Sequence, residues 1–167
     1  MADKKYLEAL IAAIKFVYEY SDGYFKTTEG RERSMVFRIA HHLANQIEGE
    51  GIFVDVEPTR CEDDVKRMSA IKTNETGNKI VPDLIIHKRK STGYLVVEFK
   101  CYYDIYDRQN DFNKLVYLTK KGNRPHYKFG IFVYLTNKFE NIEIHIFTDG
   151  CENTKLTDLY QRNFMEK

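Results

Sequence analysis

The stretch that decides the fold is residues 82–100, PDLIIHKRKSTGYLVVEFK. Two short apolar runs, LII and LVV, flank a mostly polar segment that contains a glycine. Apolar runs of this length on either side of a glycine-containing turn predict a β-hairpin. The predicted strands cover 82–88 and 94–101.

Charged residues stand where the two ends of this hairpin should meet. A symmetric turn between the runs places Asp83 opposite Glu98, and opposite residues on paired strands lie roughly 5 Å apart. Because side chains alternate faces along a strand, Lys100 shares the face of Glu98, whereas Val97 and Phe99 share the other. The sequence therefore predicts two carboxylates and an ammonium group at one end of a buried sheet.

This group of side chains has a definite chemical meaning. Two carboxylates so close together repel each other unless a proton or cation lies between them, and hard oxygen ligands favour Mg²⁺ or Mn²⁺. A lysine beside such an ion can orient a water molecule or help to deprotonate it, and can hold a phosphate oxygen. The alternative is an edge hairpin in which Glu98 and Lys100 form a structural ion pair.

The pattern PD, hairpin, ExK resembles the signature of the PD-(D/E)xK phosphodiesterase superfamily, whose members share the restriction-endonuclease-like fold. The resemblance implies that Asp83 and Glu98 bind the metal ion and that the backbone carbonyl of Phe99 adds a ligand. It further implies that Lys100 serves the attacking water. In plan the chain is similar to small stand-alone bacterial or archaeal members of the superfamily.

Periodicity along the rest of the chain predicts an α/β domain. An antiparallel run of strands, then a crossover helix and another strand, gives a mixed sheet with helices on both sides. This is also the αβββαβ core that the resemblance implies, over about residues 25–136, with a helix at 2–20 added in front of it. In chain order we expect helices at 4–20 and about 29–47, a strand at 52–57, a long loop at 59–79, the hairpin, a helix at about 106–120, strands at 127–136 and 142–147, and a short helix from residue 155.

Length and composition are those of one domain covering residues 1–167. With 43% hydrophobic residues, the chain has enough apolar surface for a core. No segment approaches the roughly 20 apolar residues that cross a bilayer, so we expect no membrane partner. The three cysteines are odd in number and widely spaced, which favours reduced thiols and a cytoplasmic location.

Glu32 is independent support for the acidic site. On a helical wheel it falls on the apolar arc of the helix at 29–47, at the N-terminal end. A carboxylate on an apolar face needs a partner, because burying an unpaired charge is costly. The resemblance implies that Glu32 completes the acidic cluster, directly or through water. The alternative is a first-turn glutamate stabilised by the helix dipole.

Several other residues are candidates for contact with a substrate. Glu57 ends the predicted strand at 52–57, and Arg60 follows three residues later. They could serve as an extra carboxylate and a phosphate clamp, or else form a structural salt bridge at the edge of a loop. His87 shares the predicted face of Asp83 and could touch the leaving-group phosphate. A histidine that merely caps the strand end is the favoured alternative.

Lys114 matches a position at which several superfamily members have a substrate-contacting side chain. The helical wheel opposes this role, because it puts Lys114 nearly opposite the predicted buried side. We therefore expect Lys114 to face solvent or to touch a distant phosphate. The predicted buried side comprises Phe112, Leu115, Val116 and Thr119.

A basic zone follows the crossover helix. No Asp or Glu occurs between residues 112 and 139, although the net charge of the whole chain is only +1. Such a zone fits a phosphate-bearing face, and a solvated surface is the alternative. The candidates to carry a nucleic-acid strand are Lys120, Lys121, Arg124 and Lys128.

Together these features predict a metal-dependent nuclease that uses Mg²⁺ or Mn²⁺ and acts on nucleic acid, DNA in preference to RNA, with a homodimer as one possible assembly. Two alternatives stay open. One is a non-catalytic module that binds nucleic acid or protein and retains the fold. The other is an α/β interaction protein in which the motif is accidental.

Overall fold

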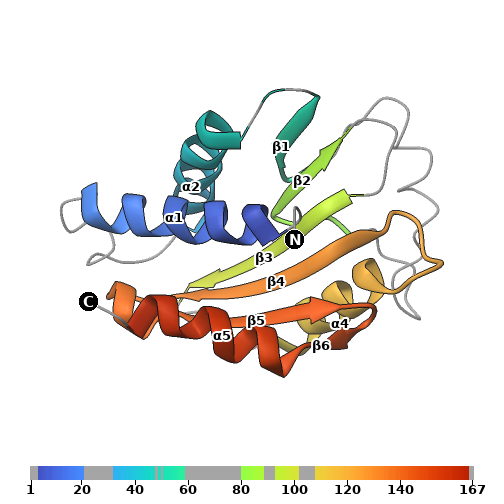
Figure 1. Ribbon diagram of the computed structural model, residues 1–167. Helices are drawn as coiled ribbons and strands as arrows, with labels where there is room; N and C mark the ends of the chain where they lie inside the picture. The colour runs from blue at the N-terminus through green and yellow to red at the C-terminus, as the bar shows by residue number, and fades with distance from the viewer. Residues whose placement is uncertain are drawn as a thin grey trace.

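The described helices and strands follow the order expected from periodicity, with β6 as an addition. The computed structural model describes residues 4–20, 32–47, 49, 51–58, 80–88, 93–101 and 108–165. The elements, labelled as in Figure 1, are α1 (Lys5–Tyr20), α2 (Glu32–Ile47), β1 (Ile52–Val56), β2 (Leu84–Lys88), β3 (Gly93–Cys101), α4 (Arg108–Thr119), β4 (Tyr127–Leu135), the 3-10 helix η3 (Phe139–Asn141), β5 (Glu143–Thr148), β6 (Cys151–Glu152) and α5 (Thr154–Met165).

These strands form one mixed sheet of six strands in the order β1-β2-β3-β4-β5-β6. β1, β2 and β3 form an antiparallel meander, and β4, β5 and β6 form another. β3 and β4 pair in parallel and are joined through α4, because parallel strands need a crossover rather than a tight turn. The expectation of a mixed α/β sheet is confirmed.

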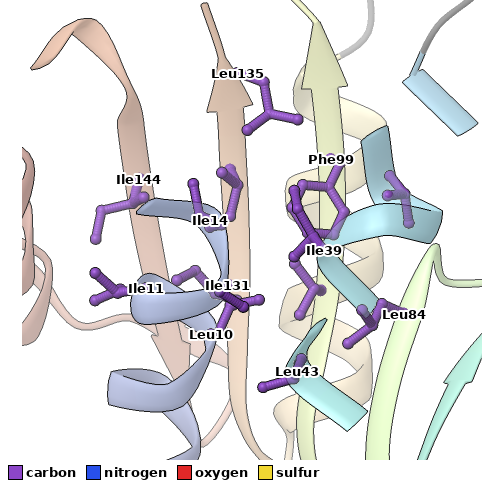
Figure 2. Close-up of a cluster of buried hydrophobic side chains, with 14 of the residues drawn as sticks. Leu10, Ile11, Ile14, Ile39, Leu43, Leu84, Phe99, Ile131, Leu135 and Ile144 are labelled. Carbon is purple, nitrogen blue, oxygen red and sulfur yellow. The ribbon is translucent and has the colours of Figure 1, made fainter. Parts of the chain in front are cut away.

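Helices cover both faces of the sheet. α1, α2 and α5 pack on one face and α4 on the other (Figure 1). Alternation along β3 supplies both cores: Val97 and Phe99 enter the core under α1 and α2, whereas Val96 enters the smaller core under α4. Figure 2 shows side chains from α1 and α2 meeting the sheet near Phe99 and Ile131.

α1 is held by an apolar stripe that repeats every three or four residues, as an amphipathic helix requires. The buried stripe includes Leu7, Leu10, Ile14 and Val17. Each such side chain stabilises the fold by roughly 1.5–3 kcal/mol on burial, so α1 is an integral layer of the domain. Within the part of the chain that the structure describes, none of the helices is long and apolar enough to cross a membrane.

The hairpin pairs in the register predicted from the sequence. Leu84 lies opposite Val97, and one further step in the same register sets Asp83 opposite Glu98. The two acidic residues therefore meet at the end of β2, next to the second half of β3. This register places the candidate site.

Candidate functional site

Two carboxylates bind the edge of β3 beyond the end of β2. In the continued register Phe99 would face Pro82, which has no N–H and cannot extend the ladder. The Asp83 side chain takes the place of that partner, and its Oδ2 accepts the Phe99 N–H at 2.7 Å. Glu32 Oε2, from α2, accepts the next N–H on this edge, that of Cys101, at 3.3 Å. The two amides are about 7 Å apart at the usual rise of a strand.

The backbone carbonyl of Phe99 faces the same edge. In a strand, the N–H and C=O of one residue point to the same neighbour, and the Phe99 N–H points to Asp83. Since Pro82 has no N–H, β2 offers this carbonyl no ladder donor. A carbonyl oxygen therefore lies beside the Asp83 carboxylate.

On the α4 face of β3, Glu98 is buried in a network with residues of α4. Its side chain is only 2% exposed, and Oε2 accepts a hydrogen bond from Lys114 Nζ at 3.1 Å. Lys114 also donates to Asp111 Oδ1 at 2.7 Å, and Asp111 Oδ2 lies 3.5 Å from Lys100 Nζ. With Asp83 next to Glu98, three carboxylates and two ammonium groups gather at the end of the hairpin.

Two buried carboxylate oxygens have no hydrogen-bond donor among the described residues. They are Glu98 Oε1 and Asp111 Oδ2, and the Asp111 atom has a longer ion-pair contact with Lys100 at 3.5 Å. Leaving such an atom without a donor costs free energy, and an unsatisfied group of this kind often marks a ligand site or stored strain. An oxygen of Glu98 is thus available to a cation.

Burial raises the pKa of both candidate metal ligands. Burial is the larger cause for Glu98, whose pKa lies well above its usual range, and the nearby Asp83 carboxylate adds to the rise. Burial also raises the pKa of Asp83, opposed by the Phe99 N–H and by the charge of Lys114. Burial alone would lower the pKa of Lys114, but Glu98 and Asp111 outweigh it and raise that pKa. The two carboxyl groups therefore favour a bound proton or cation.

A groove of about 420 Å³ reaches Asp83 between α2 and the end of β1. Phe37 is 66% exposed, and the Arg33 side chain, 86% exposed, pairs with Glu57 at 3.0 Å. The groove thus offers an aromatic ring and a guanidinium group beside the carboxylates. Its lining residues are Glu32, Arg33, Val36, Phe37, Val56, Glu57 and Asp83.

The donors present fit an ion of the magnesium type. Asp83, Glu98 and the Phe99 carbonyl are hard oxygen ligands, and Glu98 Oε1 has an unused acceptor position within the described chain. Across the described ranges, His, Cys, Asp and Glu side chains form no group of three or more that could hold a metal ion. Mg²⁺ needs only one or two carboxylates because it keeps several water ligands, so the two findings are compatible.

Glu57 lies at the rim of the groove and is held by structural contacts. Its N–H donates to the Asp83 carbonyl at 2.9 Å, and its carboxylate pairs with Arg33. A structural salt bridge was one of the two expectations for Glu57. The structure has such a salt bridge, with Arg33 as the partner. Arg60 lies outside the described residues.

His87 lies away from the carboxylates. Its Nε2 is 2.7 Å from Asp55 Oδ2, across the β1–β2 pair. It lies four positions after Asp83 along the chain, about 13 Å at the rise of a strand. The structure thus gives His87 a cross-strand partner rather than a place beside the hairpin end.

The expectation that Lys114 faces solvent is wrong. Its side chain is 31% exposed and hydrogen-bonded within the carboxylate network. The apolar residues of α4 predict a buried face centred near Phe112 and Val116. The buried face includes Asp111, and Lys114 lies one turn after Asp111. A hydrophobic pattern omits a buried carboxylate, so the signal was missed. The buried residues of α4 are Asp111, Leu115, Leu118 and Thr119.

The basic residues expected to carry a nucleic-acid strand lie at the other end of the sheet. Gly93 pairs with Tyr127 there, and Glu98 is five residues farther along β3, about 16 Å at the rise of a strand. Lys121 is paired with Asp149 at 2.8 Å. Contacts of this zone with nucleic acid would be remote from the carboxylates. The zone consists of Lys120, Lys121, Arg124 and Lys128, all exposed.

Arg108, which the sequence did not single out, fixes the start of α4 against the sheet. Its guanidinium makes two hydrogen bonds to Glu143 on β5, at 2.9 and 3.0 Å. The same group lies 4.5 Å from the ring centre of Tyr134 on β4. Because Asp111 and Lys114 follow one and two turns later, this contact sets the position of the carboxylate network.

The arrangement can hold a divalent cation beside a lysine at the head of a groove. Lys100 is 20% exposed and so reaches both the network and solvent. Comparison of the chain with protein-family models, with curated proteins and with solved structures found no match.

Proposed function

We propose that the protein is a metal-dependent nuclease that hydrolyses phosphodiester bonds of nucleic acid, DNA in preference to RNA. The observation that carries the proposal is the meeting of Asp83, Glu98 and Lys100 where Pro82 ends the ladder of the hairpin. The order α2-β1-β2-β3-α4-β4, with three antiparallel strands and a parallel fourth, supports a restriction-endonuclease-like core.

In this proposal Asp83, Glu98 and the Phe99 carbonyl hold Mg²⁺ or Mn²⁺, and Glu32 contributes directly or through water. A bound divalent ion lowers the pKa of its water and stabilises charge on the phosphate oxygens. Lys100 orients the attacking water, and Asp111, 3.5 Å from Lys100 Nζ, limits the directions in which that ammonium group can point.

The groove beside Asp83 is where a substrate strand would lie. Phe37 supplies an exposed ring on which an unstacked base can rest. Arg33 supplies a guanidinium group for a phosphate, in competition with Glu57. A homodimer would set two such grooves against a duplex. A cytoplasmic location agrees with Cys101 and Cys151, which are reduced thiols among the described residues.

The test is cleavage of single-stranded, duplex and branched DNA and of RNA, with Mg²⁺ or Mn²⁺. Wild type is compared with Lys100→Met and Glu98→Gln, and with the exposed controls Lys155→Met and Glu140→Gln. We expect each site variant to lose roughly 10²–10⁴-fold in rate, and each control to retain it. No cleavage, or cleavage that survives both site changes, would refute the proposal.

A non-catalytic binding module with the same fold is the second candidate. One observation favours it: Lys114 already neutralises Glu98 at 3.1 Å, as a site without a metal ion would require. Binding of DNA that needs no divalent ion, together with silence across the cleavage panel, would support this candidate.

A further inference from the structure

The positive charge of Lys114 lies beside Glu98, the carboxylate to which a metal ion would bind. Its ammonium group contacts Glu98 at 3.1 Å and Asp111 at 2.7 Å. We propose that Lys114 is an internal cation that competes with the divalent metal ion for Glu98, and that Asp111 holds the ammonium group while the ion is bound. This inference rests on the proposed function, because it concerns the same carboxylates.

The geometry allows Lys114 to leave Glu98 without losing all of its partners. Asp111 lies three residues earlier on α4, so the two side chains stay neighbours on the helix surface. The contact to Asp111 is also the shorter of the two. A lysine has three rotatable donors on a flexible stem, so a small swing trades Glu98 for solvent while Asp111 is kept.

The charges explain why the ion and the ammonium group should oppose each other. Without a metal ion, the network joins the three carboxyl groups of Asp83, Glu98 and Asp111 to the two ammonium groups of Lys100 and Lys114. Two cations competing for one buried carboxylate repel each other. Lys114 therefore supplies a counter-charge to Glu98 when no ion is bound, and it weakens the affinity for the ion.

A purely structural role for Lys114 predicts the opposite change in metal affinity. If Lys114 merely oriented Glu98, its removal would loosen the ligand and weaken metal binding. If Lys114 competes, loss of its charge strengthens metal binding and destabilises the metal-free protein, because Glu98 then has no counter-charge. Metal affinity therefore separates the two roles without any measurement of cleavage.

The experiment is calorimetric titration with Mn²⁺ of wild type, Lys114→Gln and the exposed control Lys155→Gln on α5. We expect Lys114→Gln to bind about tenfold more tightly or better, which is one step of about 1.4 kcal/mol in affinity, with a lower melting temperature when metal-free. The control should match wild type in both. Equal or weaker binding by Lys114→Gln would overturn the inference while the nuclease proposal stands.

The holding role of Asp111 is tested by a double-mutant cycle. Asp111→Asn should weaken Mn²⁺ binding when Lys114 is present and should have a clearly smaller effect in Lys114→Gln. An equal effect in both backgrounds would mean that Asp111 acts only through its own charge, which refutes the holding role. Wild type that neither binds Mn²⁺ nor cleaves would overturn both proposals.

A measurement on wild type covers the case in which Lys114→Gln does not fold. The ¹⁵N resonance of the Lys114 ammonium group is followed by NMR while Mg²⁺ is added. Competition predicts a shift and faster exchange of its protons with water as the group leaves Glu98. A resonance that stays unchanged while Mg²⁺ binds would refute the inference.

Discussion

The contact between Arg108 and Glu143 predicts that one substitution remote from the carboxylates will loosen the whole start of α4. Arg108→Ala removes two hydrogen bonds, of 2.9 and 3.0 Å, together with the stacking of the guanidinium on Tyr134. The change leaves Asp111 and Lys114 in the sequence but releases the turn that precedes them.

The loss of stability expected for Arg108→Ala follows from the exposure and geometry of its contacts. The Arg108 and Glu143 side chains are 35% and 42% exposed, so solvent screens the pair, and we assign it about 1 kcal/mol, the upper end for partly exposed pairs with bidentate geometry. The stacking on Tyr134 adds about 0.5–1 kcal/mol. A total near 2 kcal/mol lowers the melting temperature of a domain of this size by about 4–8 °C.

The assay is a double-mutant cycle of Arg108→Ala and Glu143→Gln, followed by urea and thermal unfolding. Its matched control is the ion pair Lys121–Asp149, near the other end of α4, whose side chains are 77% and 53% exposed. We expect a coupling free energy of about 1 kcal/mol for the first pair and none above error for the second. Equal coupling in the two pairs would refute the reasoning.

The same pair gives a pH dependence. Burial alone would raise the pKa of Glu143, but hydrogen bonds from His145 and Arg108 outweigh it and lower that pKa below 4.5. A carboxylate with a lowered pKa in the folded state stabilises the fold above its unfolded value and loses that contribution as pH falls through the folded value. Stability should therefore drop below about pH 4.5, and Glu143→Gln should remove this part of the drop.

Three further predictions follow from the site and the core. Mn²⁺ at 100 times its dissociation constant should raise the free energy of unfolding by about 2.7 kcal/mol and the melting temperature by about 5–11 °C. Asp83→Asn should abolish this shift. A wild-type melting temperature that Mn²⁺ does not change would count against the metal site. Phe37→Ala should weaken binding of single-stranded DNA in Ca²⁺ by roughly 5- to 150-fold, which is the effect of one stacked base. The control Tyr20→Ala should not, because Tyr20 is 71% exposed and lies outside the groove lining. Equal losses of affinity in the two variants would contradict the placement of the strand. Tyr18→Phe should cost about 0.5–1.5 kcal/mol in urea unfolding, because the hydroxyl donates to the Thr136 carbonyl at 2.7 Å. Burial raises the pKa of Tyr18, so an absorbance titration of Tyr18→Phe should show one late-ionising tyrosine fewer than wild type.

The sequence predicted the features that depend on local pattern. The hairpin register follows from a symmetric turn, and the meeting of Asp83 and Glu98 follows from the register. The position of Glu32 beside β3 could also be anticipated, because a carboxylate on an apolar arc must find a donor, and it finds the Cys101 N–H. Helices and strands were predicted to within a few residues for the same reason.

The features that escaped prediction depend on contacts between distant residues. Arg108 and Glu143 lie 35 positions apart, and nothing in either local pattern links them. The basic zone was expected to carry the substrate strand, but α4 runs back along the sheet, so the residues after it return to the end at which β3 begins. Asp111 escaped because burial was inferred from apolar residues alone.

The carboxylates that bind the edge of β3 have a consequence for solubility. Asp83 and Glu32 accept the Phe99 and Cys101 N–H groups, which would otherwise form a short open strand edge. Open edges recruit strands from other molecules, and charged side chains along an edge prevent this. Alanine at either position would remove the charged side chain that covers the strand edge as well as a proposed metal ligand. Such variants should therefore aggregate when the protein is concentrated. Asparagine and glutamine keep an acceptor oxygen at the edge and should leave the protein monodisperse.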